Sequence, residues 1–160
     1  MNLPHLKTCT GAGCLCHRIL VHEAGHAVMA MVLNCPLRWA TVVPDEDATG
    51  QVSLKPPTST INVMVTLAGA AAELIGCGPL DGAEQDDMDS IAVLLDKPAL
   101  EQMFQIVTAL LGAHWTAVLA LAEVLAERGT MSKSDISKAV GRHLHPMPHG
   151  EKWAKARVAL

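Results

Sequence analysis

The chain has 160 residues, half of them apolar, and a formal net charge of −4 at neutral pH. This length suits one domain with a real hydrophobic core, and the apolar content excludes an intrinsically disordered chain. The acidic balance argues against nucleic acid as a main partner.

The first segment, residues 1–14, is expected to be a flexible arm because it is polar and holds two glycines. The chain has five cysteines and no visible export signal, which indicates a reducing, cytoplasmic location. Cys9, Cys14, Cys16 and His17 lie close together in the sequence. Their spacing is not a standard zinc pattern, so ordinary reduced thiols are favoured over a second metal site or a thiol that blocks a catalytic metal.

A helix is expected over residues 15–33, because its apolar residues cover one side and Asn34 and Pro36 follow as stop signals. Gly25 lies inside this helix, although glycine there costs about 1 kcal/mol relative to alanine. A residue without a Cβ at this position predicts that another segment approaches the helix closely.

This helix carries the motif His22-Glu23-x-x-His26, the HExxH signature of zinc hydrolases. Positions i and i+4 share one face of a helix, so both imidazoles can bind one zinc ion, and a catalytic site leaves a position open for water. Glu23 can take a proton from that water, whose pKa zinc lowers to about 7. The alternative is a core helix with two satisfied histidines. It is disfavoured because polar groups in an apolar run are costly to bury without a partner.

Residues 38–44 and 51–54 are rich in β-forming residues and flank a polar turn over 45–50, which predicts a hairpin. An exposed edge of this hairpin can receive an extended peptide as an added strand. A hairpin that only covers the core fits the same residues equally well.

Two apolar windows, residues 61–80 and 104–125, are long enough to cross a membrane. Glu73 interrupts the first window and His114 the second, and no basic flanks mark an orientation, so buried helices are favoured over an integral membrane protein. His114 is interpreted as a core or surface histidine. The small residues over 68–72 predict close packing against another helix.

Residues 81–89 concentrate acidic side chains before the apolar run 91–95. Acids at this place usually interact with the N-terminal dipole of a helix, but one of them can be the third zinc ligand. Spacing leaves four candidates open: Glu84, Asp86, Asp87 and Asp89.

The next helix is expected to start at Asp96 and to continue to Arg128, with an interruption near Gly112. Ser132 and Asp135 form a capping-box pattern before one more short helix. Residues 142–160 hold three histidines and are expected to be a flexible tail, in which adventitious metal binding is the lesser alternative.

The zinc motif itself narrows the class of hydrolase. The metzincin pattern HExxHxxGxxH is excluded because Met29 occupies its glycine position and Val32 its third histidine position. Zinc hydrolases with a downstream glutamate ligand stay open as an alternative, and Glu73 is the best such candidate.

Several stretches in the same order resemble the peptidase domain of the FtsH-type ATP-dependent zinc metalloproteases. The matching stretches are residues 21–28, 42–44 with Gly50 and Pro56, 67–74, 82–86, 121–123, 130–131 and 135–136. The resemblance covers about residues 17–141. Two positions within residues 67–74 depart from the family pattern. The family has an arginine where this chain has Ala70, and a second glutamate where it has Leu74.

The resemblance implies a zinc peptidase domain over 15–141 that cleaves unfolded chains, and it selects Asp86 as the third zinc ligand. It does not carry over the unfoldase function of the family, because the sequence has no GxxxxGK[ST] motif. A separate ATPase is therefore a candidate partner, and a homo-oligomer stays open.

The sequence as a whole predicts a mainly α, compact helical metallopeptidase domain with a small β-hairpin near the active site. His22, His26 and Asp86 hold zinc, and Glu23 is the general base. The substrate is a peptide or an unfolded polypeptide, and no membrane span is expected. The alternative is a non-catalytic or partner-dependent regulatory protein that retains a zinc site.

Overall fold

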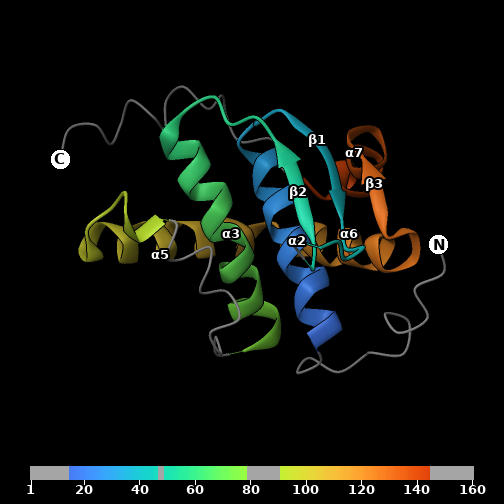
Figure 1. Ribbon diagram of the computed structural model, residues 1–160, viewed down its shortest axis with the longest axis horizontal. Coiled ribbons are helices and arrows are strands. Elements are labelled where there is room, and N and C mark those ends of the chain that lie inside the picture. Colours follow the sequence, from blue (N-terminus) through green and yellow to red (C-terminus); the bar gives the residue numbers. More distant parts are fainter. Residues whose placement is uncertain (1–14, 47–48, 79–90, 145–160) are drawn as a thin grey trace.

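The computed structural model describes residues 15–46, 49–78 and 91–144. The expected N-terminal arm, the acidic run with Asp86 and almost all of the C-terminal tail lie outside these residues. The described elements are α2 (Leu15–Val32), β1 (Leu37–Thr41), β2 (Gln51–Leu54), α3 (Ser59–Cys77), α5 (Lys97–Ala113), α6 (Trp115–Arg128), β3 (Thr130–Ser132), α7 (Lys133–Val140) and the 3-10 turn η1 (Gly141–His143). Figure 1 shows one small sheet lying against a larger group of helices, so the predicted mainly helical fold is confirmed.

Helix α2 is the centre of the fold and packs against α3 and α6. It ends as predicted, because Asn34 adopts the left-handed conformation (φ 53°) that closes helices and the Cys35 amide donates to Ala30 O at 2.8 Å. The contact with α3 is close: a Cβ built on Gly25 would lie 2.6 Å from both Ala68 O and Ala72 Cβ. The expected close approach at Gly25 is therefore confirmed, and the small residues of α3 provide it.

We expect Gly25→Ala to destabilise the protein. Overpacking a tight contact costs about 1–3 kcal/mol, and here the added methyl meets Ala68 O and Ala72 Cβ, neither of which can rotate away. This cost opposes the gain of about 1 kcal/mol in helix propensity. Urea unfolding of the zinc-free proteins measures the difference. Gly112→Ala in α5 is the matched control, because nothing lies within 4 Å of a Cβ there. Equal midpoints for Gly25→Ala and wild type would show that the helices have room to separate.

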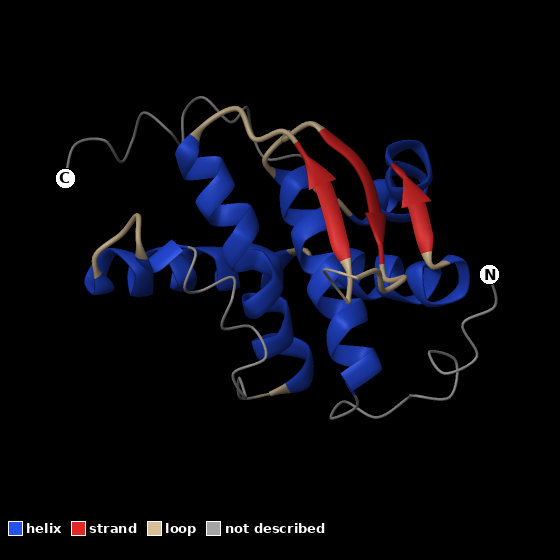
Figure 2. Cartoon of the chain, in the orientation of Figure 1, coloured by secondary structure: helices blue, strands red, loops and turns tan. Residues whose placement is uncertain are grey.

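The sheet has three antiparallel strands in the order β2-β1-β3 (Figure 2). The predicted hairpin corresponds to β1 and β2, with Thr41 opposite Gln51. The third strand was not predicted. It brings Thr130 opposite Thr41, and their hydroxyl oxygens lie 2.6 Å apart. In this arrangement β2 is an edge strand, on the side of the sheet towards α3.

The C-terminal helices follow the predicted signals. The Asp96 side chain accepts from the Ala99 amide at 2.9 Å, which caps α5. The expected interruption occurs at His114, which is buried, and α5 and α6 meet there at a bend of 77°. The capping box before α7 is also confirmed, because the Asp135 amide donates to Ser132 Oγ at 3.3 Å and the Asp135 carboxylate accepts from the Ser132 backbone amide.

By length and composition, α3 is the described helix that is apolar enough to cross a membrane, and α5 with α6 passes the same test only as a sharply bent pair. Within α3, 56% of the apolar window is buried against the rest of the protein. The burial of α3 agrees with the expectation of a packed helix.

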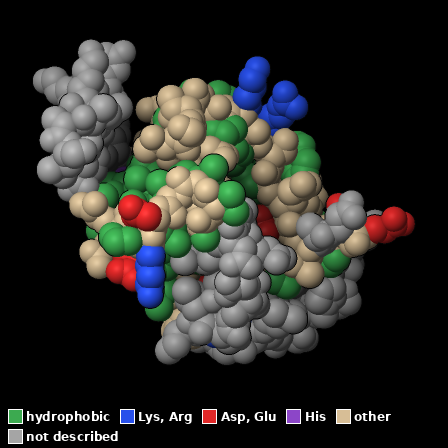
Figure 3. Space-filling view, turned by 60° about the vertical axis from the view of Figure 1, so that its left-hand side comes forward, with side chains coloured by type: hydrophobic (Ala, Val, Ile, Leu, Met, Phe, Trp, Pro, Cys, Tyr) green, Lys and Arg blue, Asp and Glu red, His purple; other side chains and the backbone are tan. Residues whose placement is uncertain are grey.

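Apolar side chains also reach the surface near the start of α5, where Val93 and Leu94 are exposed. Figure 3 turns this side of the molecule forward.

Candidate metal centre

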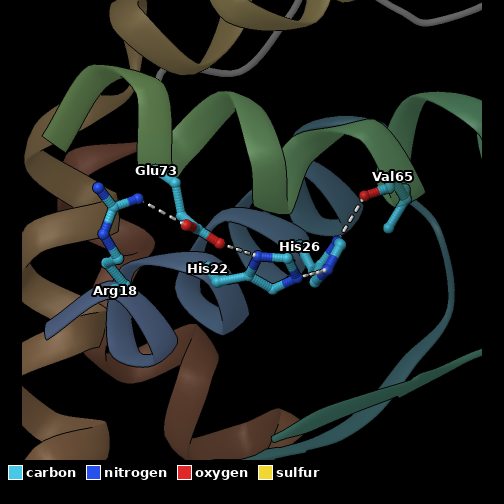
Figure 4. Close-up of polar contacts among 5 residues, drawn as sticks. All are labelled: Arg18, His22, His26, Val65 and Glu73. Atoms are coloured by element: carbon cyan, nitrogen blue, oxygen red, sulfur yellow. Dashed lines mark hydrogen bonds and ion pairs between the residues drawn. The ribbon is translucent and has the colours of Figure 1, made fainter. Parts of the chain in front are cut away.

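His22 and His26 lie one turn apart on α2 and direct their rings towards α3 (Figure 4). Their Nε2 atoms are 2.8 Å apart, and the rings meet nearly edge to face, at an interplanar angle of 79°. The i, i+4 spacing therefore brings the two imidazoles together, as the sequence predicts.

Both remaining ring nitrogens bind acceptors on α3. His22 Nδ1 lies 2.6 Å from Glu73 Oε1, and His26 Nδ1 lies 2.7 Å from Val65 O. A carbonyl can only accept, so the Nδ1 atom of His26 carries the proton, and an ionised carboxylate imposes the same tautomer on His22. This arrangement is typical of metal-binding histidines, whose second nitrogen donates to a carboxylate or a carbonyl.

The tautomers leave two Nε2 lone pairs that face each other at 2.8 Å. Such a pair needs a proton or a cation between the nitrogens, and imidazole nitrogen is a common zinc ligand. In a tetrahedral zinc site, with bonds near 2.0–2.1 Å, two such nitrogens lie about 3.3 Å apart. The rings therefore need to open by only about half an ångström to bind zinc.

Gly69 of α3 packs against the tips of both rings. A Cβ built on this residue would lie 2.4 Å from His22 Nε2 and 2.6 Å from His26 Nε2. A side chain at position 69 would therefore clash with both imidazoles where they now converge. The absence of a side chain lets α3 approach them closely, and the two Nε2 atoms are donors of the type that zinc binds.

Two histidines do not complete a zinc site. Within the ranges that the structure describes, no group of three or more His, Cys, Asp or Glu side chains is arranged to hold a metal ion. Asp86, the predicted third ligand, lies outside those ranges, as do Glu84, Asp87 and Asp89.

Glu73, the other candidate ligand, has a different place. Its Oε1 binds the Nδ1 side of His22, across the ring from Nε2, and its Oε2 binds Arg18 Nη1 at 3.2 Å. The structure therefore favours Glu73 as an orienting partner of a ligand over a ligand itself. Sequence reasoning missed this role. Two signals pointed to it: an acid inside an apolar helix needs a partner, and Arg18 precedes His22 by one helical turn.

Glu23 follows His22 on α2 and directs its side chain towards Gly50 of the hairpin. The side chain is buried, with 6% of the residue exposed. A Cβ built on Gly50 would lie 2.6 Å from Glu23 Oε1, so the carboxylate packs directly against the main chain at that residue. Because Gly50 immediately precedes β2, the proposed base lies next to the start of an edge strand.

The N-terminal cysteine cluster falls mostly outside the described residues, which include only Cys16 and His17 of its members. Cys35 follows α2 as a buried reduced thiol, and burial raises its pKa. A raised pKa lowers the thiolate fraction at neutral pH, so this thiol is suited to a place in the core.

The sequence matches no known protein family and no curated protein.

Proposed function

We propose that the protein is a zinc-dependent metalloendopeptidase that hydrolyses peptide bonds of peptides or unfolded proteins. One observation carries this proposal: the two imidazoles of the HExxH helix converge through Nε2, while α3 binds both Nδ1 atoms. His22 and His26 would hold one zinc ion per chain. The family resemblance supplies Asp86 as the third ligand.

Zinc, when bound, supplies a Lewis acid that polarises the scissile carbonyl and lowers the pKa of the attacking water to about 7. The chain's own residues orient the reaction and move the proton. Glu73 and Val65 keep His22 and His26 in the tautomers that present Nε2. Glu23 accepts the proton of the attacking water and passes it to the leaving amine as the C–N bond breaks.

The position of β2 at the edge of the described sheet supports an extended polypeptide as the substrate. An edge strand offers unpaired main-chain groups that can bind a peptide as an additional strand. The Glu23 carboxylate packs at the start of this strand, against Gly50. Recognition through the main chain favours loose sequence specificity and requires an extended chain. Native globular proteins should therefore resist cleavage unless a separate ATPase unfolds them first.

The test is cleavage of dye-labelled unfolded casein by the zinc-loaded protein and by protein from which a chelator has removed the metal. We expect hydrolysis with zinc, loss of at least about 100-fold after removal, since zinc supplies several kcal/mol of transition-state stabilisation, and recovery with one equivalent of zinc. Equal hydrolysis with and without metal would overturn the proposal. Zinc binding without hydrolysis would favour the alternative, a regulatory or partner-dependent protein that retains the zinc site.

A further inference from the structure

Charged side chains beside His22 and His26 form a row of contacts that links α2 to α3 and back (Figure 4). Arg18 Nη1 donates to Glu73 Oε2 at 3.2 Å, and His22 Nδ1 donates to Glu73 Oε1 at 2.6 Å. The Arg18 and Glu73 side chains are 12% and 5% exposed, so this ion pair is largely removed from water. Both oxygens of one carboxylate are thus engaged, one by the cation and the other by the proposed zinc ligand.

We infer that Arg18 is a positioning residue for the metal centre, and that it acts on His22 through Glu73. This inference rests on the proposed zinc site. A carboxylate held through one oxygen can rotate about its last side-chain bond, whereas the Arg18 contact fixes the second oxygen and with it the plane of the group. A fixed plane keeps Oε1 in line with His22 Nδ1. That bond in turn selects the tautomer that presents Nε2 to the metal.

A purely structural salt bridge is the competing explanation. Buried ion pairs often contribute little net stability, because desolvation of the two charges offsets their attraction. A pair kept only for folding would change the unfolding midpoint when removed and would leave the histidine tautomers as they are. The positioning role predicts a change at one histidine ring.

The second ligand supplies an internal control. His26 Nδ1 donates to the main-chain carbonyl of Val65, which no side-chain substitution removes. A change in the Arg18–Glu73 pair should therefore alter the tautomer of His22 and leave that of His26 unchanged. General loosening of the α2–α3 contact would disturb both rings.

The experiment compares Arg18→Met, Arg18→Lys and Glu73→Gln with wild type. Arg38→Met is the control, because it removes the same charge from an exposed position on β1. Ring nitrogen NMR of the zinc-free proteins reports each histidine tautomer, and competition with a chelator measures zinc affinity. We expect mixed tautomers at His22 alone and a loss in zinc affinity of about 10–100-fold for Arg18→Met. Arg18→Lys should recover part of that loss, and Arg38→Met should match wild type.

The double variant Arg18→Met with Glu73→Gln tests the order of action. If Arg18 works through Glu73, the double variant should bind zinc no more weakly than Glu73→Gln alone. The inference would be overturned if Arg18→Met kept the wild-type tautomer of His22 and bound zinc within two-fold of the wild-type affinity. This holds even if Arg18→Met unfolds at a lower midpoint than wild type. The NMR measurement needs no metal, so it still decides the positioning role if the protein fails to bind zinc.

Discussion

Glu23→Gln should abolish the hydrolysis of unfolded casein while the protein keeps its zinc. An amide has nearly the same shape as the carboxylate but cannot accept the proton of the attacking water, and general-base catalysis contributes about 10²–10⁴-fold. The change does not touch the bonds that orient the imidazoles, because His22 binds Glu73 and His26 binds Val65 on α3. Casein cleavage and zinc content, measured on the same sample, separate the chemical step from metal binding.

The matched control for this variant is Glu123→Gln, which makes the same substitution at an exposed position of α6. Its activity should equal that of wild type. Because Glu23 packs against the main chain at Gly50, the unfolding midpoint of Glu23→Gln also needs to be measured. Cleavage above a tenth of the wild-type rate by folded, zinc-loaded Glu23→Gln would remove Glu23 from the mechanism.

Gly69→Ala should eliminate zinc binding and leave the fold intact. The new methyl group would lie within 2.6 Å of both Nε2 atoms, so the two rings would have to leave the positions in which they converge. Zinc affinity should fall by more than the 10–100-fold that is typical when an orienting partner is lost, because here both ligand nitrogens are displaced. Casein cleavage should fall with it.

The fold should tolerate this methyl because the atoms it meets are the ends of two rings that can swing away. Alanine is also the better helix former, by about 1 kcal/mol. Zinc affinity by chelator competition and the unfolding midpoint together decide the outcome, with Gly112→Ala as the control for a harmless helical substitution. Unchanged zinc affinity in Gly69→Ala would place the metal elsewhere. The contrast with Gly25→Ala, where a methyl meets Ala68 O and Ala72 Cβ, separates loss of the site from loss of stability.

Local signals in the sequence predicted the helices well. Asn34 ended α2, Asp96 began α5 and Ser132 began α7, because each acts through hydrogen bonds to neighbours in the chain. The break between α5 and α6 was expected near Gly112 and occurs at His114. Strand β3 escaped prediction because three residues are too short for a strand pattern, and its pairing partner lies far away in the sequence.

The candidate site, too, was predictable where local spacing determines it and not where contacts between helices do. HExxH spacing alone places His22 and His26 on one face of a helix. The contacts that orient them come from α3, and no pattern within α2 specifies which residues of α3 will face it. Glu73 therefore looked like a candidate ligand, and Gly69 looked like one small residue among several. Asp86 came from the family resemblance alone, and its place in the site stays a prediction.

The pairing of β1 with β3 has a consequence for how the chain folds. Thr41 and Thr130 are 89 residues apart, yet they lie opposite each other in the sheet. The hairpin of β1 and β2 can form early from local contacts, but β1 keeps an open edge until the last strand arrives. During synthesis, that edge would wait until β3, 89 residues beyond Thr41, has left the ribosome. A product truncated before residue 130 would expose β1 on one side permanently, and such an edge favours association with other chains.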